Sequence, residues 1–572
     1  MKGVIAATLV ALVTVLPTFG SPQKIDQLVY KNAALPRMVD DSTFLRRAYL
    51  KIVGRVPSYT EVEQFHKNPN RKQLIETLLN SEGFTNHLFN FWADKLRLKD
   101  KLSDNNGDLR GDAYIQWVRD SISKNKPYNK FVYELLSASG NYWENPATGY
   151  YLRDIGMQLD NTANTGKLFL GSDLSCAQCH DDPFDDWTQM DFYQLAAFTN
   201  SINMRQNDPK KENEIAKEAK KASGGKNGVD NKVKQLFRAA TFGVKDNNKP
   251  LKLPHDYQYD DAKPHDIVSP RVPFGKNMVF SGSEREVFAK WVTTKNEMFA
   301  KNAVNRFWGW VFGAPLSAPS SDLISSPNQN KELIEHLSRE LVRQNYDIKK
   351  FLSILYQSRA FSAEAFSGNI KDYKFDRPLV QRLSAEQIWD SVVTLYSENP
   401  DAPPNLKLND IQDSMSYTLG ELTGEEALKK AELFEKAKKE KFKEIPKERG
   451  FLMIRSAYIN SPSKNFNLLK EFGRSDRVLI SSPDLRSSVT QVLSTMNGDL
   501  SEIPLSKNSY LKKQLESTRA HGKRTDIVFM SILSRKPLSG KEKSLAYKDM
   551  KNNGGKGVVW ALLNSKEFLY IK

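Results

Sequence analysis

The sequence predicts a mainly α protein, with two helical domains, a charged insertion between them and few strands. Three observations predict this class. Apolar residues recur at helical spacing along most of the 572 residues, whereas the alternating pattern of strands is scarce. Residues that start and stop helices flank these apolar runs. A motif of paired helices also appears near both ends of the chain.

The first predicted helices follow recognisable capping signals. Ser42 is expected to cap a helix over residues 44–53, which Gly54 ends. Ser58 and Glu61 have the spacing of a capping box, in which serine and glutamate satisfy each other's backbone N–H groups. A helix is therefore expected to begin directly after Ser58.

Two later helices are predicted in the same way. Residues 297–312 form an aromatic-rich run at helical spacing, and Ser384 with Gln387 forms a second capping box. The first of these helices carries four aromatic side chains: Phe307, Trp308, Trp310 and Phe312. They could line a sugar-binding groove or pack in the core, and their helical spacing favours the core.

An internal repeat links the two ends of the chain. Residues 55–58 and 78–84 are echoed by residues 535–539 and 562–568. In each copy Arg-x-Pro precedes a serine, and a later Leu-Leu-Asn-Ser is followed by phenylalanine. These segments are expected to be helical packing units. Two copies, one at each end, do not predict a solenoid.

The N-terminus has the features of an export signal. Lys2 precedes an apolar run over residues 4–16, and the small residues Thr18 and Gly20 fit cleavage before Ser21. We therefore assign residues 1–20 to a signal peptide. The mature chain is expected in the periplasm, without a transmembrane anchor after cleavage.

Composition divides the rest of the chain. We expect a cytochrome-like helical domain over 21–205, a charged linker or insertion over 206–277, and a companion helical domain over 278–572. The companion contains a second charged stretch near 424–449, expected to be a solvent-facing helix. The net charge of +16 is spread through the chain, and nucleic acid is not expected as a partner of an exported protein.

Both cysteines of the chain lie in one short motif, Cys176-Ala-Gln-Cys179-His180. C-x-x-C-H is the spacing of c-type haem attachment, in which two thiols form thioethers to the haem and the histidine ligates its iron. The motif therefore predicts covalently bound haem c, with Cys176 and Cys179 as the attachment residues and His180 as an axial ligand.

Three other interpretations of the motif stay open. The pair of cysteines is also the spacing of a thiol–disulfide redox centre, or of a short structural disulfide. Alternatively, Cys176, Cys179 and His180 hold Zn or Fe, with Asp182 or a neighbouring aspartate as the fourth ligand. Asp185 or Asp186 is expected to cap the following helix.

The second axial ligand of a bound haem is not identified by the sequence. Candidates by chemistry are three methionines and two histidines: Met157, Met190, Met204, His255 and His265. Familiar hydrolase motifs, such as G-x-S-x-G and H-E-x-x-H, are absent from the sequence, and the question of enzymatic activity stays open.

Several motifs resemble known families. Phe169-Leu-Gly and the stretch over 176–198 resemble a cytochrome-like domain of unknown function found in planctomycetes, as do residues 45–50 and 54–57. Its usual companion, a second planctomycete domain of unknown function, is resembled by four later segments: 303–309, 382–387, 472–477 and 562–565. Family members often have His-Asp-His after the cysteines, whereas this chain has His180-Asp181-Asp182.

The resemblance implies an exported, mainly helical protein with a c-type haem motif, and it implies no defined reaction. Our leading hypothesis is a protein with one haem that exchanges electrons with an unidentified periplasmic redox partner. The second hypothesis is a non-haem protein, with or without metal, that binds or helps to process extracellular polysaccharide together with related proteins.

Overall fold

The computed structural model describes residues 21–31, 35–102, 109–184, 186–205, 208–247, 249–273, 281–294, 296–317, 330–406, 408–417, 421–461, 467–480, 486 and 488–572. The expected signal peptide lies outside these residues. Helices dominate the described chain, and its strands are two to five residues long. The predicted mainly α class is confirmed.

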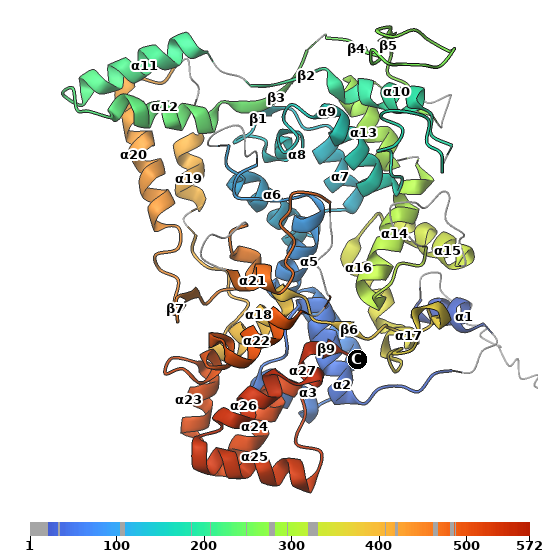
Figure 1. Cartoon of the computed structure of the whole chain (residues 1–572), viewed down its shortest axis with the longest axis vertical. Helices are drawn as coiled ribbons and strands as arrows, with labels where there is room; N and C mark the ends of the chain where they lie inside the picture. Colours follow the sequence, from blue (N-terminus) through green and yellow to red (C-terminus); the bar gives the residue numbers. More distant parts are fainter. Residues whose placement is uncertain are drawn as a thin grey trace, which may run out of the picture.

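The N-terminal part is a succession of short helices (Figure 1). In chain order they are α1 (Pro22–Tyr30), α2 (Asp41–Ala48), η1 (Tyr49–Val53), α3 (Tyr59–Lys67), α4 (Arg71–Leu79), α5 (Glu82–Lys95), α6 (Asp112–Ser123), α7 (Tyr128–Leu136), η2 (Pro146–Thr148), α8 (Gly149–Leu152), α9 (Gln158–Thr165), η3 (Gly166–Leu170) and α10 (Gln189–Asn200).

The insertion and the C-terminal part continue this pattern. Their helices are α11 (Pro209–Ala222), α12 (Val229–Ala240), α13 (Glu284–Thr294), α14 (Glu297–Phe312), α15 (Lys331–Arg343), α16 (Ile348–Gln357), α17 (Arg359–Ser362), η4 (Ile370–Asp372), α18 (Ala385–Tyr396), α19 (Leu408–Met415), α20 (Gly424–Glu440), η5 (Ser456–Tyr458), α21 (Asn467–Glu471), α22 (Val489–Asn497), η6 (Asp499–Ser501), η7 (Ile503–Leu505), α23 (Tyr510–Ser517), α24 (His521–Leu533), α25 (Gly540–Asn553), α26 (Lys556–Leu563) and α27 (Lys566–Leu569).

The strands form small antiparallel sheets. One sheet has the order β1 (Gly140–Asn141), β3 (Phe242–Asp246), β2 (Ile202–Arg205), and the pairs are β4 (Leu251–Lys252) with β5 (Ile267–Val268), β6 (Gln381–Arg382) with β9 (Tyr570–Ile571), and β7 (Lys447–Glu448) with β8 (Phe451–Leu452). The β6–β9 pair brings the C-terminal end of the chain to the start of α18.

Most of the predicted helix boundaries are found in the structure, with one correction. Ser58 and Glu61 form the predicted capping box of α3, and α14 covers the predicted residues 297–312. The cap of α2, however, is Asp40 and not Ser42: the Asp40 carboxylate accepts a hydrogen bond from Thr43 N at 3.0 Å. The cap lies two residues earlier than predicted because an aspartate ahead of the serine satisfies the free N–H groups first.

Two buried arginines of α2 attach the N-terminal part to the C-terminal end of the chain. Arg46 donates to the carbonyl oxygens of Ile532 at 2.7 Å and Phe568 at 2.8 Å. Arg47 donates to the carbonyl oxygen of Lys572 at 2.7 Å. These contacts explain why a helix near the start of the chain carries charged residues on a buried face.

The hydrophobic core does not divide where the charged insertion lies. One cluster of buried side chains joins the N-terminal helices to α13–α17, across the insertion. A second cluster fills the C-terminal helices and also contains Leu50 and Val56 from the start of the chain. The two halves of the sequence therefore share their cores.

The two charged stretches pack against each other. Figure 1 shows α11 and α12 beside α20 at one corner of the molecule. Val233, Leu236 and Phe434 are among the buried side chains of this lobe. A Cβ atom on Gly424 would lie 2.5 Å from Ala219 N, so α20 approaches the backbone of α11 directly. Each charged helix thus exposes one face and buries the other.

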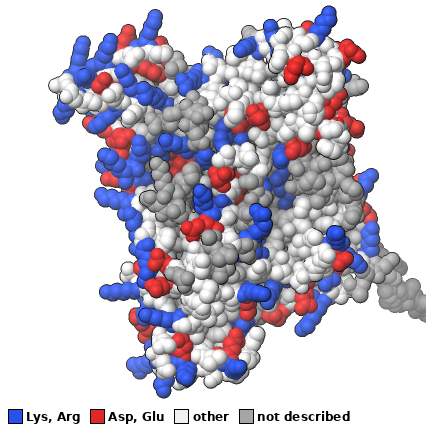
Figure 2. Space-filling view, in the orientation of Figure 1, with Lys and Arg blue, Asp and Glu red and all other residues white. Residues whose placement is uncertain are grey.

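The exposed surface mixes both signs of charge. On the face in Figure 2, Lys and Arg side chains lie among Asp and Glu over most elements, including the α11–α12 lobe. This arrangement provides no large area of a single sign on that face. Within the described residues, no helix has both the length and the apolar character needed to cross a membrane.

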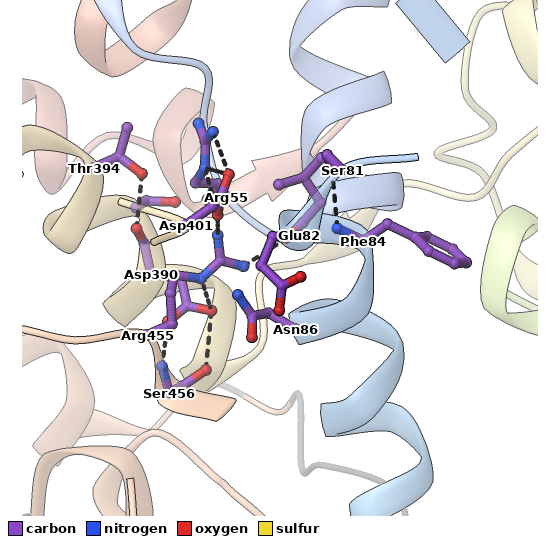
Figure 3. A network of polar contacts seen from close by, with 12 residues as sticks. Arg55, Ser81, Glu82, Phe84, Asn86, Asp390, Thr394, Asp401, Arg455 and Ser456 are labelled. Carbon is purple, nitrogen blue, oxygen red and sulfur yellow. Dashed lines mark hydrogen bonds and ion pairs between the residues drawn. The ribbon is translucent and has the colours of Figure 1, made fainter. Parts of the chain in front are cut away.

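A buried ion network joins the two halves near α5 (Figure 3). Arg55 pairs with Asp401 at 2.7 Å. It also pairs with Glu61 at 2.8 Å. Asp401 also pairs with Arg455, which lies 2.9 Å from the Asp390 carboxylate. Because each of these buried charges has a partner of opposite sign, the network offsets the cost of desolvation.

Candidate functional site

The segment that leads into the cysteine motif is fixed by α14. Asn302 Nδ2 donates to the carbonyl oxygen of Leu168 at 2.8 Å, and Arg306 donates to those of Lys167 and Leu168 at 3.2 Å. The π-helical turn η3 then ends at Gly171, which has a left-handed φ of 71°. The helix therefore stops shortly before the motif and the chain turns outward.

The motif itself forms one turn of chain. The amide groups of Cys179 and His180 donate to the carbonyl oxygen of Cys176 at 3.1 and 3.2 Å. Ala177 is fully buried and anchors the turn, whereas Cys179 and His180 are exposed and Cys176 is half-buried. Both cysteines are free thiols. The side chains of Cys176, Cys179 and His180 therefore lie at or near the surface, on a turn that the buried Ala177 holds in place.

The imidazole of His180 is held in one tautomer. His180 Nδ1 lies 2.7 Å from the carbonyl oxygen of Asp181. A carbonyl oxygen only accepts hydrogen bonds, so Nδ1 carries the proton and donates it. The lone pair is then on Nε2, the nitrogen that remains able to bind a metal ion.

The aspartates after the motif have structural roles. Asp181 Oδ1 accepts a hydrogen bond from Gln189 N at 2.8 Å, and Asp182 Oδ1 accepts one from Phe184 N at 2.9 Å. The predicted cap of the next helix is wrong: Thr188 caps α10, and its side chain accepts from Asp191 N. Asp185 lies outside the described residues. The prediction failed because Thr188 lies next to the helix and forms a capping box with Asp191.

Tyrosines from separate elements contact the motif. Tyr259 Oη, between β4 and β5, accepts a hydrogen bond from Asp181 N at 2.7 Å. Burial raises the pKa of Tyr193 on α10, and the nearby Cys179 and Asp256 raise it further. The sequence placed Tyr193 only in the following helix, and it did not indicate Tyr259, because no local pattern connects a residue 78 positions away to this segment.

The local charges act on Cys176 in one direction. Burial raises the pKa of its thiol, and Asp182, Asp173 and Cys179 raise it further. Among the described residues, no group of three or more His, Cys, Asp and Glu side chains has an arrangement that suits a metal ion. The alternative non-haem set of Cys176, Cys179, His180 and Asp182 stays a prediction.

Comparison with known families identifies two domains in the chain. Residues 24–204 match PSCyt2, described as a protein of unknown function (DUF1549), and residues 284–547 match PSD1, also of unknown function (DUF1553). The chain carries a PSCyt2 domain followed by a PSD1 domain. No curated protein and no solved structure matches it. The resemblance stated from the motifs is confirmed, including the order of the two domains.

The family boundaries place the site and its support in different domains. The cysteine motif lies in PSCyt2, whereas α14, which holds η3, lies in PSD1. The charged insertion lies between the two matches. Because α14 of PSD1 bonds to the segment before the motif, the two domains pack directly against each other.

The candidate second ligands differ in exposure. Met204 is buried in the core and Met190 packs against it, whereas Met157 is 48% exposed. His255 and His265 lie between the PSCyt2 and PSD1 matches and are both exposed. Burial in an existing core disfavours Met204 as a ligand, because it would have to leave its packing contacts. The other four residues stay predictions.

Proposed function

We propose that this protein is an exported c-type cytochrome-like protein that holds one haem through Cys176 and Cys179 and exchanges electrons with a periplasmic partner. In this proposal His180 Nε2 is one axial ligand. A bound haem would supply a centre that accepts and releases one electron. The residues of the motif bind and orient this group, and the rest of PSCyt2 and PSD1 fixes the motif in place.

The observation that carries the proposal is the state of the three motif side chains. Two free thiols and an imidazole share one exposed turn. The hydrogen bond from His180 Nδ1 to the carbonyl oxygen of Asp181 supports ligation through Nε2, because metal-binding histidines commonly donate their other N–H group in this way. The residues present therefore fit covalent haem.

The electrostatics of the turn disfavour the redox-dithiol alternative. A reactive C-x-x-C pair usually lies at a helix N-terminus, where the pKa of its first cysteine is lowered. Cys176 lies in a turn well before α10, and burial together with the nearby acidic groups raises its pKa. The thiol form of Cys176 is thus favoured over the thiolate that such exchange chemistry needs.

A haemochrome measurement tests the proposal. The full chain would be expressed in a periplasm that contains the c-type haem maturation system, beside Cys176→Ser, Cys179→Ser and His180→Ala variants. We expect wild-type protein to retain haem after denaturing electrophoresis. Each cysteine variant should lose about half or more of the covalent signal, since one of two thioethers is removed. His180→Ala should keep attached haem with an altered spectrum.

A matched control separates the motif from other histidines. His66→Ala removes an exposed imidazole in the last turn of α3, which is not among the candidate axial ligands, and should leave haem content unchanged. Wild-type protein that is colourless under these conditions would contradict the proposal. Bound Zn in that colourless protein would favour the non-haem hypothesis, and the metal content of the two cysteine variants would then test the same residues.

A further inference from the structure

A second candidate site, whose lining contains none of the motif residues, lies at the junction of PSCyt2 and PSD1. A cavity of about 360 Å³ is lined by side chains of η1 and α5 from PSCyt2 and of α14, β6 and α18 from PSD1. This volume lies within the range of small-molecule sites in proteins. Sites at domain junctions are also common, because two surfaces can supply different chemical groups.

Two buried cations line this cavity without a carboxylate partner among the described residues. Lys51 Nζ donates to the carbonyl oxygen of Trp310 at 3.3 Å and to the side-chain oxygen of Gln381. Arg306 donates through one nitrogen to the carbonyls of η3, whereas its buried Nε has no hydrogen-bond partner in the described chain. Both side chains are more than nine-tenths buried.

Buried charges without a counter-ion are costly. Burial lowers the pKa of Lys51 to about 7, and the nearby Arg47 adds to this shift. Burial also lowers the pKa of Arg306. An anion in the cavity would oppose both shifts and stabilise the two side chains in their charged forms.

Two carboxylates of the cavity lining lie beside arginines, although Glu386 Oε1 has no hydrogen-bond partner among the described residues. Asp94 pairs with Arg477 at 3.0 Å, and Glu386 lies 3.6 Å from Arg474 Nε. These arginines approach from outside the cavity lining. The positive charges of Lys51 and Arg306 are therefore not cancelled by the acidic side chains beside them.

One wall of the cavity is aromatic. The Trp310 ring lies 5.6 Å from that of Phe91 and 5.2 Å from that of His87, measured between ring centroids. Both Trp310 and Phe91 remain half-buried, whereas Phe307, Trp308 and Phe312 are fully packed in the core. The cavity also offers a hydrogen-bond acceptor: Asn90 is buried, and its Oδ1 has no partner among the described residues.

We propose that this cavity binds a small organic acid that contains a ring. The carboxylate would contact Lys51 and Arg306, the ring would lie against Trp310, and a hydroxyl group of the ligand would donate to Asn90 Oδ1. An ionised carboxylate satisfies the donors of lysine and arginine better than a neutral group does. The aromatic wall offers apolar contact to a flat ring of either aromatic or sugar type.

Two pairs of probes test the proposal on the full chain by isothermal titration calorimetry. Glucuronate is compared with glucose, and 4-hydroxybenzoate with 4-hydroxybenzyl alcohol, so that each acid carries a hydroxyl group and has a neutral partner with the same kind of ring. We expect at least one acid to bind about tenfold or more tightly than its neutral partner, as charged hydrogen bonds predict. The acid that binds better identifies the type of ring.

Variants place the binding in the cavity. Lys51→Met should weaken binding of the acid about tenfold or more, whereas Lys51→Arg should retain most of it because the charge is kept. Lys51→Met is expected to fold, since it removes no ion pair. Trp310→Leu should weaken binding of both members of a pair. The control is Lys301→Met, which changes a half-buried lysine on α14 that pairs with Glu297 and does not line the cavity.

Three outcomes would overturn the proposal: neither acid binds, each acid binds no better than its neutral partner, or Lys301→Met weakens binding as much as Lys51→Met does. Haem content is measured on the same samples. Since the cavity and the cysteine motif are built from different residues, loss of acid binding with unchanged haem content keeps this inference separate from the proposed function.

Discussion

The sequence repeat forms two similar turns between helices, one at residues 55–61 and one at residues 535–542, which we call the first and second corners. In each, an arginine precedes a proline, a serine caps the next helix, and the arginine pairs with the glutamate three residues after the cap. Arg55 pairs with Glu61 at 2.8 Å, and Arg535 pairs with Glu542 at 3.2 Å. The sequence repeat therefore encodes a repeated ion pair that clamps the turn between two helices.

The corners differ in the source of a further carboxylate. Glu567 of α27 pairs with Arg535 at 2.7 Å. The first copy has Gly83 at the corresponding position, and Asp401 of PSD1 pairs with Arg55 at 2.7 Å instead. A Cβ atom on Gly83 would lie 2.9 Å from Asp401 Oδ2. A glycine thus makes room for a carboxylate from the other domain, and a local corner becomes a contact between domains.

The depth of burial follows from this difference. The Arg55 side chain is 4% exposed, and its network continues through Asp401 to the fully buried Arg455. The Arg535 side chain is 14% exposed, and both of its partners are about one-third exposed. The same local plan is therefore expected to contribute more stability at the domain junction than at the C-terminal surface.

Removing the arginine of each corner should give the largest contrast. Arg55→Ala leaves Glu61 and Asp401 facing each other without their shared cation, and we expect a loss of about 3–5 kcal/mol in the free energy of unfolding. Arg535→Ala affects a more exposed corner and should cost about 1–2 kcal/mol. Urea denaturation, followed by circular dichroism, measures both. Equal losses of unfolding free energy in the two variants would show that the contact with Asp401 at the domain junction adds no stability to the first corner.

Filling the space at Gly83 should have a smaller effect. In Gly83→Ala, the added methyl group would lie 2.2 Å from Val53 Cγ1 as well as close to Asp401, so a neighbour must move. We expect a cost of about 1–3 kcal/mol, typical of overpacking. Denaturation of the Gly83→Ala variant with and without Val53→Ala separates the two clashes, because Val53→Ala relieves only one.

The second corner provides the matched control for this substitution. Gly540 is the first residue of α25, and no atom lies within 4 Å of a Cβ atom built there. Gly540→Ala should therefore be neutral or slightly stabilising, since alanine favours the helix. A similar cost for both substitutions would mean that close packing at Gly83 is not the cause.

This comparison also shows which features the sequence could predict. The arginine, proline, serine and capping glutamate of a corner lie within a few residues, and they were recognised as a repeat. Asp401 is 346 positions from Arg55, and no local pattern connects them. At the cysteine motif, likewise, Cys176, Cys179 and His180 were recognised from their spacing, but the contact from Tyr259, 78 positions from Asp181, was not predicted.

The packing between the charged insertions was not predicted, for a related reason. Their surface residues predicted exposed helices, and each of α11, α12 and α20 does expose a charged face. Their small and apolar residues, such as Ala219 and Phe434, form only narrow stripes. A stripe of this kind shows that a helix packs, but it does not identify its partner, so packing between insertions about 200 residues apart became visible only in three dimensions.

The pH dependence of stability should give the smallest and most specific contrast. Burial alone would raise the pKa values of Glu61 and Glu542, but the arginine beside each carboxylate lowers both below the usual 4.5. A lowered pKa means that the carboxylate stabilises the folded state above about pH 4.5 and loses this effect as the pH falls through the folded value. Glu61→Gln should therefore cost about 1–3 kcal/mol at pH 7, and Glu542→Gln about 0.5–1 kcal/mol. Both costs, measured by urea denaturation against wild type at each pH, should shrink by pH 3. If the loss of unfolding free energy stays constant with pH, it comes from lost packing and not from the ion pairs.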